Sequence, residues 1–95
     1  MIKKFRHKGL KKLFETGKVI GINPEHMIRL RRILALLETA GTIEDMDLPG
    51  LNLHELKGNR KGTWSVKVSG NWRVTFRIDN GDVYNVDYED YHKRR

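Results

Sequence analysis

The chain is short, basic and free of cysteine. It has 95 residues, of which 38% are hydrophobic, so we expect a single domain with one core over residues 1–95. Nineteen Lys and Arg against 12 Asp and Glu give a net charge of +7, which favours a polyanionic partner. The absence of cysteine excludes disulfides and thiolate metal sites, and no apolar run is long enough to span a bilayer. We therefore expect a cytoplasmic protein without a membrane partner.

Two helices are predicted in the first half of the chain. Residues 2–6 are compatible with an opening strand, and the apolar side chains of residues 10–14 have the spacing of one helical face. Asn23-Pro24-Glu25 supplies an N-cap, a first-turn proline and a first-turn acid for a second helix. Apolar residues of that helix recur at three- and four-residue spacing over residues 27–37, until Gly41 provides a stop.

The second half of the chain predicts an antiparallel sheet. After an irregular acidic connection over residues 42–49, an extended piece begins at Leu51. Apolar and polar residues then alternate over residues 64–68 and 72–78, which indicates a hairpin. Asn80-Gly81 makes the next turn. A final strand follows over residues 83–88, with Tyr84, Val86 and Tyr88 expected on one face.

The loop length of the hairpin decides its register. A three-residue loop, Ser69-Gly70-Asn71, sets Val68 opposite Trp72, whereas a two-residue loop would pair Val68 with Arg73. We choose the three-residue loop, which also pairs Val66 with Val74 and Trp64 with Phe76. It places Lys67 opposite Arg73, a like-charge pair that is unfavourable unless an anion lies nearby. This pair is a candidate phosphate site.

The signatures of common enzymes are missing. There is no GxxxxGK[ST] phosphate loop, no GxGxxG, no HExxH and no paired His at metal-ligand spacing, so we expect neither a cofactor nor a metal. Ser65 and Ser69 lack the Gly-x-Ser-x-Gly elbow of a serine hydrolase.

Polar residues that can do chemistry occur in three places. They are His54 and Lys57 with Arg60 and Lys61, then Asn71 and Arg73 with Arg77, and finally Asp90, Tyr91 and His92. Each can also be an ordinary surface residue, and residues 93–95 are expected to be a disordered basic tail. Together they suit RNA, because RNA brings its own nucleophile in the 2′-hydroxyl. The protein then needs only a base, an acid, cations for the phosphorane charge and an aromatic ring that stacks on a base.

Four separated blocks of the chain resemble the HigB branch of the RelE/ParE toxins, which are neutralised by an antitoxin. The blocks are residues 4–10 with Phe14-Glu15, residues 53–58 with 62–65, residues 71–76, and residues 80–84 with 88–92. They occur in the family order and cover nearly the whole chain. The resemblance implies an α+β fold in which two N-terminal helices pack on a twisted, mostly antiparallel sheet.

The resemblance also implies an activity and its partners. A RelE-like toxin of this branch is a metal-independent endoribonuclease that cuts mRNA in the ribosomal A site. The 2′-hydroxyl attacks the adjacent phosphate and leaves a 2′,3′-cyclic phosphate and a 5′-hydroxyl. Its partners are the 70S ribosome with mRNA and a cognate antitoxin of the helix-turn-helix type, and operator DNA is bound only through the antitoxin complex.

Roles for single residues follow from the same resemblance. Asp90 is expected to be the general base and His92 the general acid, with His54 as a rival for either role. Lys57 and Arg73 are expected to stabilise the phosphorane, and Tyr91 to stack on or orient the reacting nucleotide. The RNA-binding residues are expected to be Arg60, Lys61, Lys67, Asn71 and Arg77.

Two other functions remain open. A ParE-like toxin shares the fold but poisons DNA gyrase, and the sequence Asp90-Tyr91-His92 argues against it because gyrase poisoning needs no acid–base pair. A non-catalytic inhibitor that binds the ribosome or nucleic acid would need only charge and exposed aromatic rings. Replacing His92 with alanine separates cleavage from binding.

Overall fold

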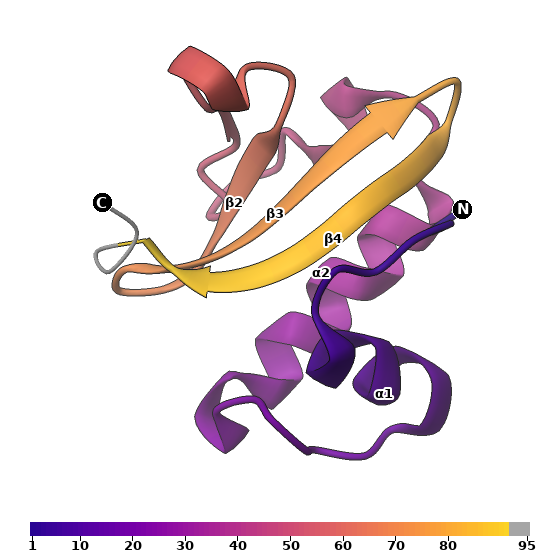
Figure 1. The fold of residues 1–95 in the computed structure, drawn as a ribbon, viewed down its shortest axis with the longest axis vertical. Helices are drawn as coiled ribbons and strands as arrows, with labels where there is room; N and C mark the ends of the chain where they lie inside the picture. The colour runs from indigo at the N-terminus through magenta and orange to yellow at the C-terminus, as the bar shows by residue number, and fades with distance from the viewer. Residues whose placement is uncertain (92–95) are drawn as a thin grey trace.

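The structure, a computed structural model, describes residues 1–91 of the chain. Its elements in order are α1 (Lys8–Thr16), η1 (Pro24–His26), α2 (Met27–Thr39), η2 (Ile43–Met46), β1 (His54–Glu55), η3 (Gly58–Arg60), β2 (Trp64–Ser69), β3 (Trp72–Asp79) and β4 (Asp82–Asp90). Figure 1 shows the two α-helices on one side of the twisted sheet, which confirms the predicted α+β architecture. Within the described part of the chain, no helix has the length and apolar character needed to cross a bilayer.

Both predicted helices are present, and side chains cap their starts. The ring Nδ1 of His7 accepts a hydrogen bond from the Leu10 amide, 3.2 Å away, at the start of α1. Helix α1 ends at Gly17, whose φ of +77° is the left-handed conformation that glycine adopts easily. The Asn23 side chain accepts from the Glu25 amide, as predicted. The turn that it caps is the 3₁₀ turn η1, which leads directly into α2.

The four strands form one antiparallel sheet in the order β1-β2-β3-β4. Residues 2–6 do not form a regular strand. They make two isolated parallel bridges to the free edge of β4, through Ile2 with Val83 and Phe5 with Val86. The extended piece predicted from residue 51 contributes only the two-residue strand β1.

The inner pairs of the β2–β3 hairpin are confirmed, and its predicted loop is wrong. Trp64 lies opposite Phe76, and Lys67 lies opposite Arg73. The register then shifts between Lys67 and Ser69, so that Ser69, and not Val68, pairs with Trp72. A bulge absorbs one residue, which leaves a two-residue turn at Gly70-Asn71 without disturbing the inner pairs.

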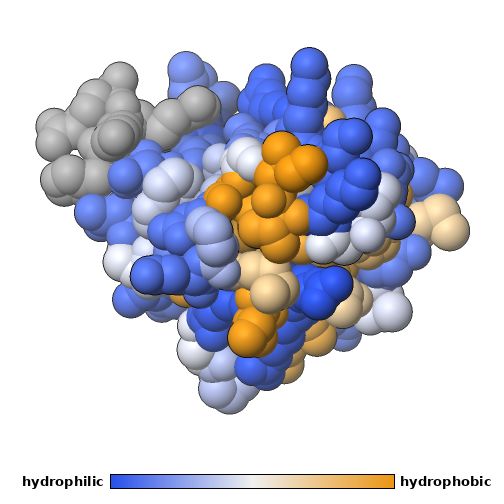
Figure 2. Space-filling view, turned by 90° about the horizontal axis from the view of Figure 1, so that it is seen from below, coloured by the Kyte–Doolittle hydropathy of each residue, from blue (hydrophilic) through white to orange (hydrophobic). Residues whose placement is uncertain are grey.

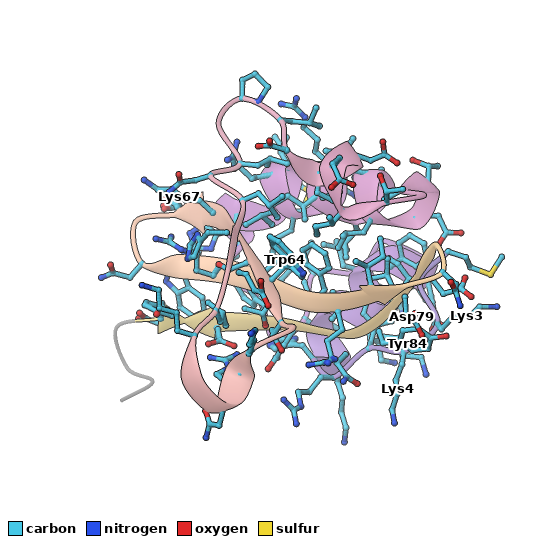
Figure 3. All side chains as sticks on the ribbon, turned by 90° about the horizontal axis from the view of Figure 1, so that it is seen from above. Lys3, Lys4, Trp64, Lys67, Asp79 and Tyr84 are labelled. Carbon is cyan, nitrogen blue, oxygen red and sulfur yellow. The ribbon has the colours of Figure 1, made fainter. Side chains whose placement is uncertain are left out.

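A second bulge corrects the predicted face of Tyr84. Thr75 pairs with Asp87 but Arg77 pairs with Tyr84, so β4 carries an extra residue between these pairs, and Asn85 there has a φ of +56°. The extra residue reverses the alternation of side chains. As a result Val86 and Tyr88 are buried, whereas Tyr84 is half-buried and lines an open pocket with Arg77. Figure 3 shows Tyr84 near Lys4 and Asp79, at the end of the sheet away from Lys67.

One core lies between the helices and the sheet. Its buried members include Leu10 of α1, Leu37 of α2 and Phe76 of β3, all with no exposed surface. The side of the molecule seen in Figure 2 carries an apolar patch among hydrophilic residues. Because the core lies between the helices and the sheet, the helices cover one face of the sheet. We call the opposite face the outer face.

Candidate active site

An open pocket of about 400 Å³ at one end of the sheet brings together residues from two of the three groups of polar residues that the sequence predicts to do chemistry. His54 comes from β1, Lys57 from the loop before η3, and Tyr91 from the residue after β4. Glu55, Leu56 and Arg60 complete the lining. The His54, Lys57 and Tyr91 side chains are all exposed, so a ligand in the pocket can reach an imidazole, an ammonium group and a phenol ring.

A backbone contact orients the His54 imidazole. Its Nδ1 lies 3.1 Å from the carbonyl oxygen of Asn52. Because a carbonyl only accepts hydrogen bonds, Nδ1 carries the proton, and in the neutral ring Nε2 keeps a lone pair. His54 can therefore accept a proton at Nε2 and donate it again, as acid–base catalysis requires.

The loop that carries Lys57 is closed by its own hydrogen bonds. The Leu56 amide donates to the Thr63 carbonyl at 2.8 Å, and the Gly62 amide donates to the Glu55 carboxylate at 2.8 Å. Sequence reasoning gave Glu55 no role of its own. The loop holds the backbone of Lys57 in place, while its ammonium group stays in solvent, where it can approach a phosphate.

Arg60, which was predicted to bind RNA, has a protein partner. Its two terminal nitrogens donate to the two carboxylate oxygens of Glu89, at 3.0 and 2.9 Å, and Glu89 is buried at 5% exposed. The Thr75 hydroxyl donates to the same carboxylate at 3.2 Å. The bond to Glu89 raises the pKa of the Arg60 guanidinium, which stays charged. Sequence reasoning gave no role to Glu89. The only indication of one is that a carboxylate stands inside a strand.

Asp90 and its neighbour Tyr91 line different pockets. It lines a second pocket of about 510 Å³ together with His7, Trp72 and Tyr88 on the helix side of the sheet. His92, the predicted acid, and the basic tail 93–95 lie outside the described residues. The predicted base and the pocket of His54 and Lys57 therefore lie on either side of the end of β4.

The tip of the β2–β3 hairpin lies beside this end of β4. The Tyr91 amide donates to the Asn71 carbonyl at 2.8 Å, and the exposed Asn71 side chain points away from the core. Arg73 is half-buried, and its guanidinium donates to the carbonyls of Gly70 and Trp72. Neither Asn71 nor Arg73 lines the pocket of His54 and Lys57.

Arg77 lies further along the outer face. Its guanidinium donates to the Lys61 carbonyl and to the Thr63 hydroxyl, at 3.5 and 3.4 Å, and it lines a pocket with Lys4 and Tyr84. The Lys61 side chain is exposed. The predicted RNA-binding cations are thus spread along the outer face and the hairpin tip, and do not form one cluster.

A buried aromatic cluster connects β4 to the helical layer. The Tyr88 hydroxyl lies 2.6 Å from Nδ1 of His26, and its ring stacks on Trp72 with the ring centres 4.6 Å apart. The His26 ring is edge-on to both of these rings. Burial raises the pKa of the Tyr88 phenol, so the hydroxyl stays protonated. It donates to Nδ1 of His26 or accepts from it according to the tautomer of the ring. This cluster fixes the strand just before Asp90.

Comparison with known proteins identifies the family to which this fold belongs. The family model described as RelE-like toxin of type II toxin-antitoxin system HigB matches residues 3–92. The chain belongs to the HigB family. Endoribonuclease HigB of Proteus vulgaris is 47% identical over 92 residues, which cover 97% of this chain and 100% of that protein. Toxin HigB-1 of Vibrio cholerae is 32% identical over 95 residues, covering 98% and 99%. A type II toxin acts with an antitoxin, so HigB membership implies an antitoxin partner.

Proposed function

We propose that this chain is an endoribonuclease that cuts mRNA in the ribosomal A site. The observation that carries the proposal is the pocket in which His54, Lys57 and Tyr91 converge from three segments. The relative from Proteus vulgaris is named an endoribonuclease, and it aligns with this chain over its full length. A net charge of +7 adds a field that attracts RNA.

The chemistry needs few protein groups. The 2′-hydroxyl loses its proton to a base and its oxygen attacks the adjacent phosphorus. The bond to the 5′-oxygen breaks, and that oxygen takes a proton from an acid, leaving a 2′,3′-cyclic phosphate and a 5′-hydroxyl. His54 serves as base or acid through Nε2, and the Lys57 ammonium group stabilises the charge on the phosphorane. Tyr91 stacks on a base next to the scissile bond. Asp90 is kept as the other candidate base, although it lines the neighbouring pocket with His7 and Trp72. His92 is kept as the other candidate acid and lies outside the described residues.

The openness of the pocket supports a requirement for the ribosome. His54 and Lys57 are exposed, so the protein alone holds a flexible RNA strand poorly in line for attack. An mRNA strand that the ribosome already holds in the A site has this orientation. Correct orientation of the reacting groups supplies a large part of the rate enhancement of an enzyme. We infer that the 70S ribosome with mRNA is the substrate complex and that the protein acts in the cytoplasm. Operator DNA is reached only through the complex with a helix-turn-helix antitoxin.

The direct test is cleavage of a defined message, mapped by primer extension, with programmed 70S ribosomes and with the same RNA alone. We expect cleavage only with ribosomes. Lys57→Ala should lower kcat by about 100- to 1,000-fold, the usual cost of losing one group that stabilises transition-state charge. Lys11→Ala, an exposed lysine on α1, makes the same change in net charge and should alter kcat less than about twofold.

The other outcomes separate the alternatives. If the protein stops growth without cutting RNA in either reaction, and supercoiling by gyrase is inhibited instead, the chain is a ParE-like poison. If it blocks translation on intact message, with equal potency for Lys57→Ala and the parent protein, it is a binding-only inhibitor. Equal cleavage of free and ribosome-bound RNA would contradict the role given to the ribosome.

A further inference from the structure

The ion pair between Arg60 and Glu89 joins the two walls of the candidate active site. Arg60 ends η3, three residues after Lys57, and Glu89 lies two residues before Tyr91. The two partners are 29 residues apart in the chain. A contact between them therefore sets how far the loop of Lys57 lies from the strand end that carries Tyr91.

The geometry of the pair is of the kind that fixes a position. Both oxygens of Glu89 are engaged by the two arms of the guanidinium, at 3.0 and 2.9 Å, and the Thr75 hydroxyl adds a third bond at 3.2 Å. A bidentate pair is strong and has a strict orientation, because the planar fork matches the carboxylate. Only 4% of the Glu89 side chain and 28% of the Arg60 side chain are exposed, so water screens this pair weakly.

The same geometry argues against a direct contact between Arg60 and RNA. The two terminal nitrogens that would grip a phosphate are already bonded to Glu89, and the carboxylate balances the positive charge. A phosphate would have to displace the buried carboxylate of Glu89, which would then lose both of its bonds to Arg60. Arg60 thus differs from Lys57, whose side chain is exposed.

We propose that Arg60 and Glu89 are positioning residues, and that the rate of RNA cleavage depends on their ion pair although neither residue touches the RNA. The pair holds Lys57 and Tyr91 at a fixed separation across the pocket. This inference rests on the proposed endoribonuclease function. It adds that Glu89 and Arg60 act together, by holding the side chains of Lys57 and Tyr91 in position.

The test is a double-mutant cycle on ribosome-dependent cleavage with Glu89→Gln, Arg60→Met and the double variant. We expect each single variant to lower kcat by about 100-fold, the size of effect produced by a misplacement of about 1 Å. The KM for programmed ribosomes should stay within about threefold. The double variant should be no slower than the worse single variant, because the two changes break one contact. Arg60→Lys keeps the charge and can keep one bond, so it should recover part of kcat.

Two further variants separate positioning from simple stability. Thr75→Val removes only the third bond to Glu89 and keeps the ion pair, so it should fold well and lower kcat only several-fold. Val66→Ala opens a cavity on the helix side of the sheet, away from the pocket. All rates are compared per folded molecule, with the folded fraction measured by near-ultraviolet circular dichroism. Val66→Ala should then match the parent protein.

Four results would overturn the inference. If Arg60→Met raises KM while Glu89→Gln leaves kcat unchanged, Arg60 contacts RNA directly. If the variants lose no more kcat per folded molecule than Val66→Ala, the pair serves the fold alone. If the parent protein cuts no RNA, the proposed function fails, and this inference fails with it. If the parent protein cuts RNA but the effects of Glu89→Gln and Arg60→Met on kcat are additive in the double variant, the inference is overturned and the proposed function stands.

Discussion

The buried hydroxyl of Tyr88 is a sharp test of how β4 is held against the helical layer. It bonds Nδ1 of His26 at 2.6 Å, and the Asn23 amide approaches the same oxygen at 3.4 Å. His26 and Tyr88 are only 7% and 5% exposed, so water cannot replace the lost partner. Tyr88→Phe removes the oxygen and keeps the ring that stacks on Trp72. The change therefore isolates the hydrogen bonds from the packing.

The expected cost of Tyr88→Phe is about 2 kcal/mol of unfolding free energy. A buried hydrogen bond contributes about 1 kcal/mol net, and leaving the His26 ring nitrogen unsatisfied adds a penalty of about 1 kcal/mol or more. For a domain of this size, 2 kcal/mol corresponds to a fall in Tm of about 8–16 °C. Tyr88→Ala also loses the ring, so it should cost about 4 kcal/mol.

Urea titrations followed by tryptophan fluorescence measure this cost. Tyr91→Phe is the matched control, because the Tyr91 ring is 46% exposed, and it should change the unfolding free energy by less than about 0.5 kcal/mol. Equal midpoints for Tyr88→Phe and Tyr91→Phe would refute the reasoning. So would a Tyr88→Phe cost as large as that of Tyr88→Ala, since the ring would then contribute nothing.

Two further predictions concern pH and backbone conformation. Burial lowers the pKa of His7 below its usual 6.5, against a smaller raising effect of Asp87, so the unfolded chain binds this proton more readily than the folded one. The unfolding free energy should therefore fall as the pH drops below about 6.5. The fall should be smaller in His7→Asn, which keeps an N-cap acceptor but does not titrate. If the unfolding free energy of this variant depends on pH as strongly as that of the parent protein, His7 is not the source of the dependence. Gly50→Ala should cost about 1–2 kcal/mol, because its φ of +86° disfavours a side chain. Gly62→Ala should cost more in the same urea titration, because its Cβ would also lie 2.8 Å from the Arg77 guanidinium, and equal costs would mean that this contact relaxes freely.

The regular part of the sheet could be predicted because alternation and turn residues agree. Trp64 and Phe76 pair as expected, since both lie on the apolar side of a period-two pattern. The two bulges could not be predicted in this way. A bulge inserts one residue into a strand without an obvious mark in the sequence, so Val68 lost its expected partner and Tyr84 changed face.

The candidate site depends on one of these bulges. The extra residue at Asn85 reverses the alternation of β4, so that Tyr88 packs on the helical layer and Glu89 points to the outer face. Only there can Glu89 reach Arg60. In the sequence both residues look like surface charges, because nothing local tells which side of the strand they occupy. The resemblance to HigB toxins gave roles to His54, Lys57 and Tyr91 together with Arg73, Asp90 and His92, a grouping that spacing alone would not have assembled. The pocket contains only the first three of these residues among those that the structure describes.

The parallel bridges between residues 2–6 and β4 also determine when the candidate site can form during synthesis of the chain. Lys3 and Arg6 donate backbone hydrogen bonds to the carbonyls of Val83 and Val86, so these residues find their partners only after the chain has been made through residue 86. Contacts across such a sequence separation close late in folding. A nascent chain that has not yet exposed β4 lacks the strand that positions Tyr91 and Glu89. Synthesis through β4 therefore precedes assembly of the candidate site.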